Sequence, residues 1–121
     1  MSDPFFDTNI LIDWLSGSSQ ARVELARYKR HRISRIVWTE ILVGEPLERR
    51  DTLQHVLSAF EVVEIDARIA LAAADIRHRT HMKLMDAYVL ATAQVNGAIL
   101  ITRNTKDFPA QMPGIRVPYQ L

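Results

Sequence analysis

The sequence predicts an α/β protein with three layers, in which helices cover both faces of a central, mostly parallel β-sheet. Short runs of β-branched and aromatic residues alternate with longer helical segments, a pattern typical of βαβ units. The chain has 121 residues, 48% of them hydrophobic, which is enough for one domain with a real core. We therefore expect residues 1–121 to form a single domain.

In the first half of the chain, strands are predicted by short apolar runs and helices by apolar residues that recur on one face. Gly17 and the two serines after it separate the first two helices, and Pro46 lies just beyond the third. The expected elements, in order, are a strand at 4–7, helices over 8–16 and 20–30, a strand over 33–38, helices over 39–44 and 48–59, and a strand at 62–65.

In the second half, Asp66 is a good N-cap for a helix that runs to about residue 80. The stretch 84–96 is apolar nearly all round, so we expect a buried central helix that ends at Gly97. Short strands are expected over 98–102 and 114–120. The order of strands and helices supports the parallel sheet.

The composition excludes several classes of protein. There is no cysteine, which removes disulfides and thiolate metal sites and fits a reducing cytoplasm. No apolar run approaches the roughly 20 residues of a membrane span, and the first residues lack the features of a signal peptide. We therefore expect a cytoplasmic protein that does not enter a membrane.

Basic residues gather between positions 22 and 35, although the whole chain carries a net charge of only +1. Such a run is either a solvated helix face or a patch that contacts phosphates. The solvated face is the more ordinary explanation, so the run alone is weak support for a nucleic-acid partner.

Four acidic residues stand where a parallel sheet binds ligands. Asp7, Glu40 and Asp107 come at or shortly after the ends of expected strands, and Asp86 begins the buried helix. In such folds, ligands bind beyond the carboxyl ends of the strands. We expect the four carboxylates to converge on one pocket.

Each of these acids also has a purely structural explanation. Asp7 and Asp86 suit a helix N-terminus, Glu40 suits a first helical turn, and Asp107 suits a turn before Pro109. Asp86 fits this explanation least. The residues three, four and seven positions after it are apolar, and a carboxylate on a buried face needs a partner.

Converging carboxylates repel one another unless a cation lies between them. Oxygen ligands favour Mg²⁺ or Mn²⁺ over zinc, so we expect one of these two metals at the acids. His78 and His81 lack a spacing typical of a zinc site and are expected at the surface or behind the metal ligands.

Four motifs together resemble PIN-domain nucleases, and most closely the small VapC-type toxins of prokaryotic toxin–antitoxin pairs. They are "FFDTNILID", "WTEILVGE", "KLMDAYVLATAQVNGAILITRNTKDF" and the closing "PGIRVPYQ", which span nearly the whole chain. "DTN" alone is unspecific, whereas its combination with the DAxxxATA helix and "TRNTKDF" is specific. Met85 and His81 depart from the family pattern, which commonly has a proline or small residue and a glycine at these positions.

The resemblance implies a three-layer α/β/α PIN-like domain that hydrolyses RNA with Mg²⁺ or Mn²⁺ and leaves 5′-phosphate ends. It also implies a homodimer and a neutralising antitoxin as partner, as in type II toxin–antitoxin pairs. It assigns the metal and the catalysis to four acids: Asp7, Glu40, Asp86 and Asp107. It assigns the orientation of these acids to small polar residues: Thr8, Asn9, Thr102 and Asn104. Arg103 and Lys106, with the basic run, are candidates for holding the RNA backbone.

Three other hypotheses stay open at this point. A dehalogenase-like phosphatase would use Asp7 as nucleophile, but it needs a second acid two positions on, where this chain has Asn9. A PIN-like domain can also be a non-catalytic module that binds nucleic acid or protein. The acids can, thirdly, be helix caps alone. Asp13 is left out of the site, because it is expected on the solvent side of its helix.

Overall fold

The computed structural model describes residues 3–120, and its centre is a five-stranded sheet with the strand order β3-β2-β1-β4-β5. Every pair of neighbouring strands is parallel. The strands are β1 (Phe5–Phe6), β2 (Arg32–Ser34), β3 (Glu61–Val63), β4 (Leu100–Ile101) and β5 (Ile115–Arg116).

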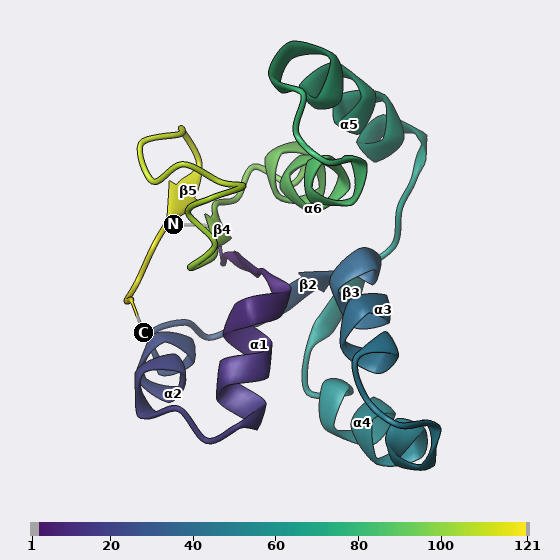
Figure 1. Ribbon diagram of the computed structural model, residues 1–121, viewed down its shortest axis with the longest axis vertical. Helices are drawn as coiled ribbons and strands as arrows, with labels where there is room; N and C mark the ends of the chain where they lie inside the picture. Colours follow the sequence, from purple (N-terminus) through teal and green to yellow (C-terminus); the bar gives the residue numbers. More distant parts are fainter. Residues whose placement is uncertain (1–2, 121) are drawn as a thin grey trace.

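Helices cover both faces of the sheet. They are α1 (Thr8–Leu15), α2 (Ser19–Ala26), α3 (Arg35–Val43), the 3-10 helix η1 (Leu47–Arg49), α4 (Arg50–Leu57), α5 (Ala67–Thr80) and α6 (Leu84–Val95). Figure 1 shows α1 and α2 on one face and α5 and α6 on the other. Helix α3 contacts both α1 and α6. The predicted three-layer α/β/α fold is therefore confirmed.

The two central strands are apolar because both of their faces are covered. Phe5, Phe6, Leu100 and Ile101 are at most 1% exposed, as expected for strands between two helical layers. Burial of each such side chain contributes about 1.5–3 kcal/mol to the stability of the fold. This core fixes the strand ends on which the acidic residues lie.

Helix α6 is the buried central helix that the sequence predicts. Ala87, Leu90 and Ala91 are at most 2% exposed, and α5 packs along the helix. Asp66 caps α5 as expected, because its carboxylate accepts a hydrogen bond from the backbone N–H of Ile69 (2.9 Å). Gly97 follows α6 with a φ of 64°, a left-handed conformation that glycine adopts without strain.

The predicted strand over 33–38 is wrong in its second half. Only Arg32–Ser34 pairs with the sheet, and α3 begins at Arg35. Ser34 causes the change, because its hydroxyl accepts a hydrogen bond from the N–H of Ile36 (3.1 Å) and caps the helix. The helix predicted over 20–30 also ends earlier, at Ala26.

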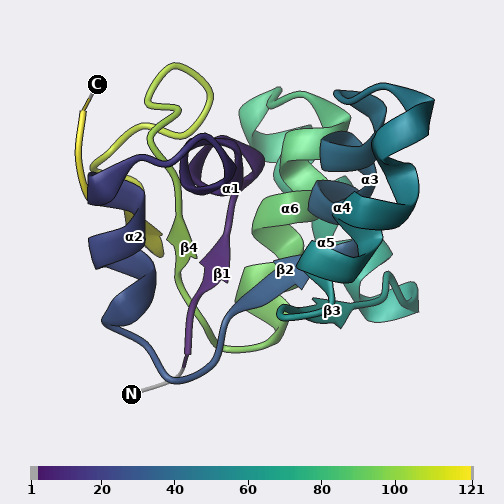
Figure 2. The same cartoon turned by 90° about the horizontal axis from the view of Figure 1, so that it is seen from below.

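The C-terminal ends of the strands meet at one edge of the sheet, as in Figure 2, where α1 begins above β1 and the loop after β4 lies beside it. The N–H of Asp7 donates to the carbonyl of Ile101 (2.9 Å), which joins the ends of β1 and β4. Among the helices of residues 3–120, none has both the length and the apolar character needed to cross a membrane.

Candidate functional site

Asp7 begins the site as both a helix cap and a buried acid. It follows β1 directly, and its Oδ1 accepts a hydrogen bond from the N–H of Thr8 (2.8 Å). Its Oδ2 accepts from the hydroxyl of Thr102 (2.8 Å) and from the amide of Asn9 (3.1 Å). Burial nevertheless raises the pKa of Asp7, and the negative charge of Glu40 adds to the rise.

Asn9 and Thr102 hold this carboxylate from two directions. Asn9 Nδ2 also contacts Thr102 Oγ1 (3.3 Å), so the two side chains and Asp7 form one network between α1 and the end of β4. Thr102 is fully buried. The orienting roles predicted for these two residues stay a proposal, but both lie where such a role requires.

Glu40 reaches the site from α3. The hydroxyl of Thr8 donates to Glu40 Oε1 (2.7 Å), which links the starts of two motifs that are 32 positions apart. The expectation that Glu40 stands in a first helical turn is wrong, because α3 begins five residues earlier, at Arg35. The side chain of Glu40 is exposed.

Asp107 is held in the loop after β4 by Asn104. The amide of Asn104 donates to Asp107 Oδ2 (2.9 Å), and the N–H of Asp107 donates back to Asn104 Oδ1 (3.2 Å). The next residue, Phe108, is fully buried and anchors the loop in the core. This reciprocal pair holds the carboxylate of Asp107, and an orienting role of Asn104 at a metal site stays a prediction.

Asp86 lies in the first turn of α6 and faces the other three acids. Burial raises the pKa of Asp86 to about 6, and the charges of Asp107, Asp7 and Glu40 contribute further, in that order. Within residues 3–120, the Asp86 side chain accepts no hydrogen bond from another residue. Asp86 thus lies within electrostatic reach of the three other acids, whereas their convergence on one functional site stays a prediction.

The chemistry of these donors fits a hard divalent cation. All are carboxylates, a cation would relieve the repulsion that raises the pKa of Asp86, and Asp7 Oδ1 has only one hydrogen-bond partner. In residues 3–120, however, no three acidic or histidine side chains are close enough to form a complete metal site. The side chains of Glu40 and Asp86 would have to turn toward the cation. His78 and His81 are both exposed.

A lysine for which the sequence predicted no role also lies at this edge of the sheet. Lys83 precedes α6, and its Nζ lies 3.9 Å from Asp107 Oδ2 while the side chain is 74% exposed. The positive charge of Lys83 lowers the pKa of Asp86 and so opposes the effect of the three other acids. Its position three residues before Asp86 was the available signal. Lys106 is also exposed in the loop that carries Asp107.

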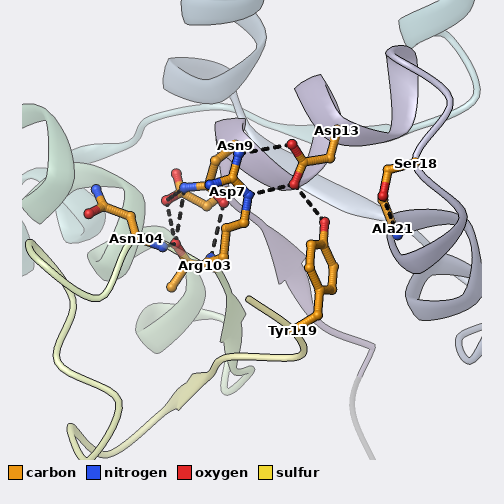
Figure 3. Close-up of polar contacts among 9 residues, drawn as sticks. Asp7, Asn9, Asp13, Ser18, Ala21, Arg103, Asn104 and Tyr119 are labelled. Carbon is orange, nitrogen blue, oxygen red and sulfur yellow. Dashed lines mark hydrogen bonds and ion pairs between the residues drawn. The ribbon is translucent and has the colours of Figure 1, made fainter. Parts of the chain in front are cut away.

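The expectation that Asp13 lies on the solvent side of α1 is wrong. The residue is buried, with 6% of its surface exposed. Its carboxylate takes two hydrogen bonds from the guanidinium of Arg103 (2.6 and 2.9 Å) and one from the hydroxyl of Tyr119 (2.8 Å). Figure 3 shows both side chains reaching this one carboxylate. Because the guanidinium is engaged inside the protein, the structure lends no support to the predicted contact of Arg103 with RNA.

Much of the basic run between positions 22 and 35 is engaged in ion pairs and hydrogen bonds at the protein surface. Arg30 pairs with Glu61 (2.6 Å) and Arg35 pairs with Glu64. Arg27 lies 3.8 Å from Glu24, and Arg32 donates to the backbone carbonyl of Asp3. Residues 27–32 lie at or before the start of β2, at the edge of the sheet opposite to the acids. The ordinary explanation of the run is therefore the better one.

Comparison with known proteins agrees with the geometry. The model of the PIN domain family matches residues 5–111. Among curated proteins, no match is found.

Solved structures with a similar fold come from toxin–antitoxin complexes and related proteins. A toxin–antitoxin complex from Klebsiella pneumoniae contains a chain that is 40% identical, with a TM-score of 0.91, over 98% of this chain and all of that one. A DNA-bound VapBC from Salmonella typhimurium is 25% identical, with a TM-score of 0.79, over 96% of each chain. FitAcB from Neisseria gonorrhoeae, at 22% identity and a TM-score of 0.80 over 98% of this chain and all of that one, shares the fold.

Proposed function

The chain belongs to the PIN-domain family, and from this premise we propose that it is a metal-dependent endoribonuclease and the toxin of a type II toxin–antitoxin pair. The family makes it a nuclease, that is, a hydrolase. The observation that supports this best is the placement of four carboxylates, at the N-cap of α1, in α3, in α6 and in the loop after β4, so that burial and the charges of the other three raise the pKa of Asp86. The similarity to chains of toxin–antitoxin complexes supports an antitoxin as partner. A homodimer is part of the proposal.

We propose that Asp7, Glu40, Asp86 and Asp107 hold Mg²⁺ or Mn²⁺. When bound, this cation would make a water more acidic and would stabilise the charge of the phosphate. Asp7 is fixed by Thr8, Asn9 and Thr102, so it supplies a rigid ligand. One of the four carboxylates would orient the attacking water for in-line attack on the phosphodiester. No ribose 2′-hydroxyl is needed, so the products should carry 5′-phosphates.

Exposed cations near the acids would hold the RNA backbone. Lys83 and Lys106 are exposed and can present their charges to a phosphate, since the ion pair of Lys83 with Asp107 is long and weak. The family assignment also argues against the phosphatase hypothesis, and Asn9 donates to Asp7 rather than offering a second acid.

Cleavage of an end-labelled RNA tests the proposal. We expect Mg²⁺-dependent cleavage that is lost in Asp7→Asn and in Asp86→Asn. Asp75→Asn is the matched control, because Asp75 is an exposed acid on α5 outside the site. Equal cleavage in EDTA, or by both site variants, would overturn the assignment. Binding of diverse RNAs and of Mn²⁺ without any cleavage would favour the non-catalytic module.

A further inference from the structure

The protein holds two similar clusters in which an arginine and a tyrosine grip one buried carboxylate. The Asp13 clamp consists of Asp13, Arg103 and Tyr119, and the Glu24 clamp consists of Glu24, Arg116 and Tyr28. In the Glu24 clamp, Arg116 donates twice (2.7 and 3.0 Å) and Tyr28 once (3.1 Å). The two acids are 6% and 4% exposed. The clamps thus have nearly the same local chemistry.

Only the Asp13 clamp continues into the acidic site. Besides its guanidinium contacts, Arg103 donates its backbone N–H to Asn9 Oδ1 (3.1 Å). Asn9 and Asp13 are four positions apart and so lie on the same face of α1. Arg103, in the loop after β4, therefore donates hydrogen bonds to two successive turns of α1, the helix that Asp7 caps, as Figure 3 shows.

The contact with Asn9 decides which way its amide points. An amide has one accepting and one donating end. Because Oδ1 is taken by the N–H of Arg103, Nδ2 is turned toward Asp7 Oδ2 (3.1 Å) and Thr102 Oγ1 (3.3 Å). The opposite orientation would set an amide oxygen against the carboxylate of Asp7. The donor to Asp7 is thus selected by the position of Arg103.

We propose that Arg103, held by Asp13 and Tyr119, is a positioning residue that orients Asn9 and through it the carboxylate of Asp7. This inference rests on the proposed function, because it assigns Asp7 to the metal site. It also gives a role to the C-terminal tail, since Tyr119 follows β5. Neighbours of metal ligands typically change metal affinity or activity about 10- to 100-fold when they are removed.

Paired variants of the two clamps test the proposal in the full-length protein. Arg103→Met and Arg116→Met each break one clamp and are expected to lower the melting temperature similarly. Mn²⁺ affinity, measured by titration calorimetry, should fall about ten-fold in Arg103→Met and stay unchanged in Arg116→Met. The side-chain amide resonance of Asn9 should shift in the first variant only. Equal Mn²⁺ affinity in both variants, with an unmoved Asn9 resonance, would overturn the proposal.

Asp13→Asn separates positioning from RNA contact. If Arg103 positions Asn9, Asp13→Asn and Arg103→Met should both lower kcat and leave KM nearly unchanged. If Arg103 binds RNA instead, only Arg103→Met should act, and mainly on KM. Should Arg103→Met fail to fold, Tyr119→Phe removes a single hydroxyl and is expected to weaken Mn²⁺ binding about five-fold, against no effect of Tyr28→Phe. No loss in Tyr119→Phe would then count against the proposal.

Three separate measurements, of RNA cleavage, Mn²⁺ affinity and the Asn9 resonance, distinguish a failure of this inference from a failure of the proposed function. A wild-type protein that binds Mn²⁺ but cuts no RNA contradicts the nuclease assignment, while the Mn²⁺ affinities still test the clamp. If the wild type binds no Mn²⁺, the metal site is refuted, and the Asn9 resonance still shows whether Arg103 orients that amide.

Discussion

Asp86 is a carboxylate whose surroundings disfavour its charge. It lies on a helix whose next turns are buried, it faces three other acids, and its pKa rises to about 6. A raised carboxyl pKa destabilises the metal-free fold wherever the group is ionised. A divalent cation beside the four acids would therefore relieve the repulsion at Asp86.

Asp86→Asn should stabilise the metal-free protein while it abolishes cleavage. Because the side chain is only half-buried, we expect the free energy of unfolding to rise by about 1 kcal/mol at pH 7. The gain should vanish below about pH 4, where Asp86 is protonated in both the folded and the unfolded state. Urea unfolding in EDTA at pH 7 and pH 4 measures this. A variant less stable than the wild type at pH 7 would contradict it.

Lys83→Gln should weaken RNA binding more than the same change far from the site. Loss of one phosphate contact is expected to reduce the slope of log Kd against log salt by about 0.7. Lys29→Gln is the matched control, because Lys29 is also exposed but precedes β2 at the opposite edge of the sheet. Fluorescence anisotropy with an inactive Asp7→Asn background provides the measurement. Equal slopes for the two lysine variants would refute this role of Lys83.

At the residue scale, the sequence predicts where an acid lies when the acid follows a strand. It does not predict the location of an acid that is held by residues far away in the chain. Asp7 and Asp107 could be placed because a strand end precedes each of them. Asp13 could not, because its partners Arg103 and Tyr119 are 90 and 106 positions away. Its spacing of four from Asn9 was the one local sign that it shares a face with the site.

At the scale of elements, the errors fall where a cap overrides an intrinsic preference. The β-branched residues after Ser34 favour a strand, yet the hydroxyl of Ser34 starts a helix among them. Elements with strong periodicity or a clear cap, such as α5 and α6, were predicted almost to their ends. The order of the strands in the sheet could not be read from the chain, since it depends on contacts between distant segments.

The turn between α5 and α6 holds a residue in a conformation that suits glycine. His81 ends α5 with a φ of 59°, the left-handed region that costs a side chain roughly 1–2 kcal/mol. The resemblance to the family had marked this position as one where glycine is common. The backbone conformation supplies the physical reason for that preference.

His81→Gly should therefore stabilise the protein by about 0.5–1 kcal/mol, the relief of strain being partly offset by the freedom of glycine in the unfolded chain. His78→Gly is the matched control and should destabilise by about 1 kcal/mol, because His78 is an exposed position within α5. Thermal and urea unfolding measure both. If both variants lose stability alike, the left-handed strain at His81 is not significant.

For the whole molecule, the contributions of two groups of carboxylates to folding stability change with pH in opposite directions. Hydrogen bonds from Arg103 lower the pKa of Asp13, and pairing with Arg116 lowers the pKa of Glu24 although burial opposes it. Their stabilisation is present above about pH 4 and is lost as the pH falls further. Burial raises the pKa of both Asp7 and Asp86, so their contribution to stability is full below about pH 4 and is lost at higher pH, which for Asp86 happens as the pH rises through about 6.

The metal-free protein should therefore melt at its highest temperature near pH 4–5 and lose stability between pH 5 and 7.

Saturating Mg²⁺ or Mn²⁺ should raise the melting temperature at pH 7 and flatten this decline, because a cation that binds only the folded state stabilises it by mass action. At 100 times its Kd, the gain is about 2.7 kcal/mol. Asp7→Asn should abolish most of the gain, whereas Asp75→Asn should keep it. Differential scanning calorimetry across pH, with EDTA or excess metal, measures these curves. If neither metal changes the melting temperature at pH 7, that result would contradict a cation site at the four acids.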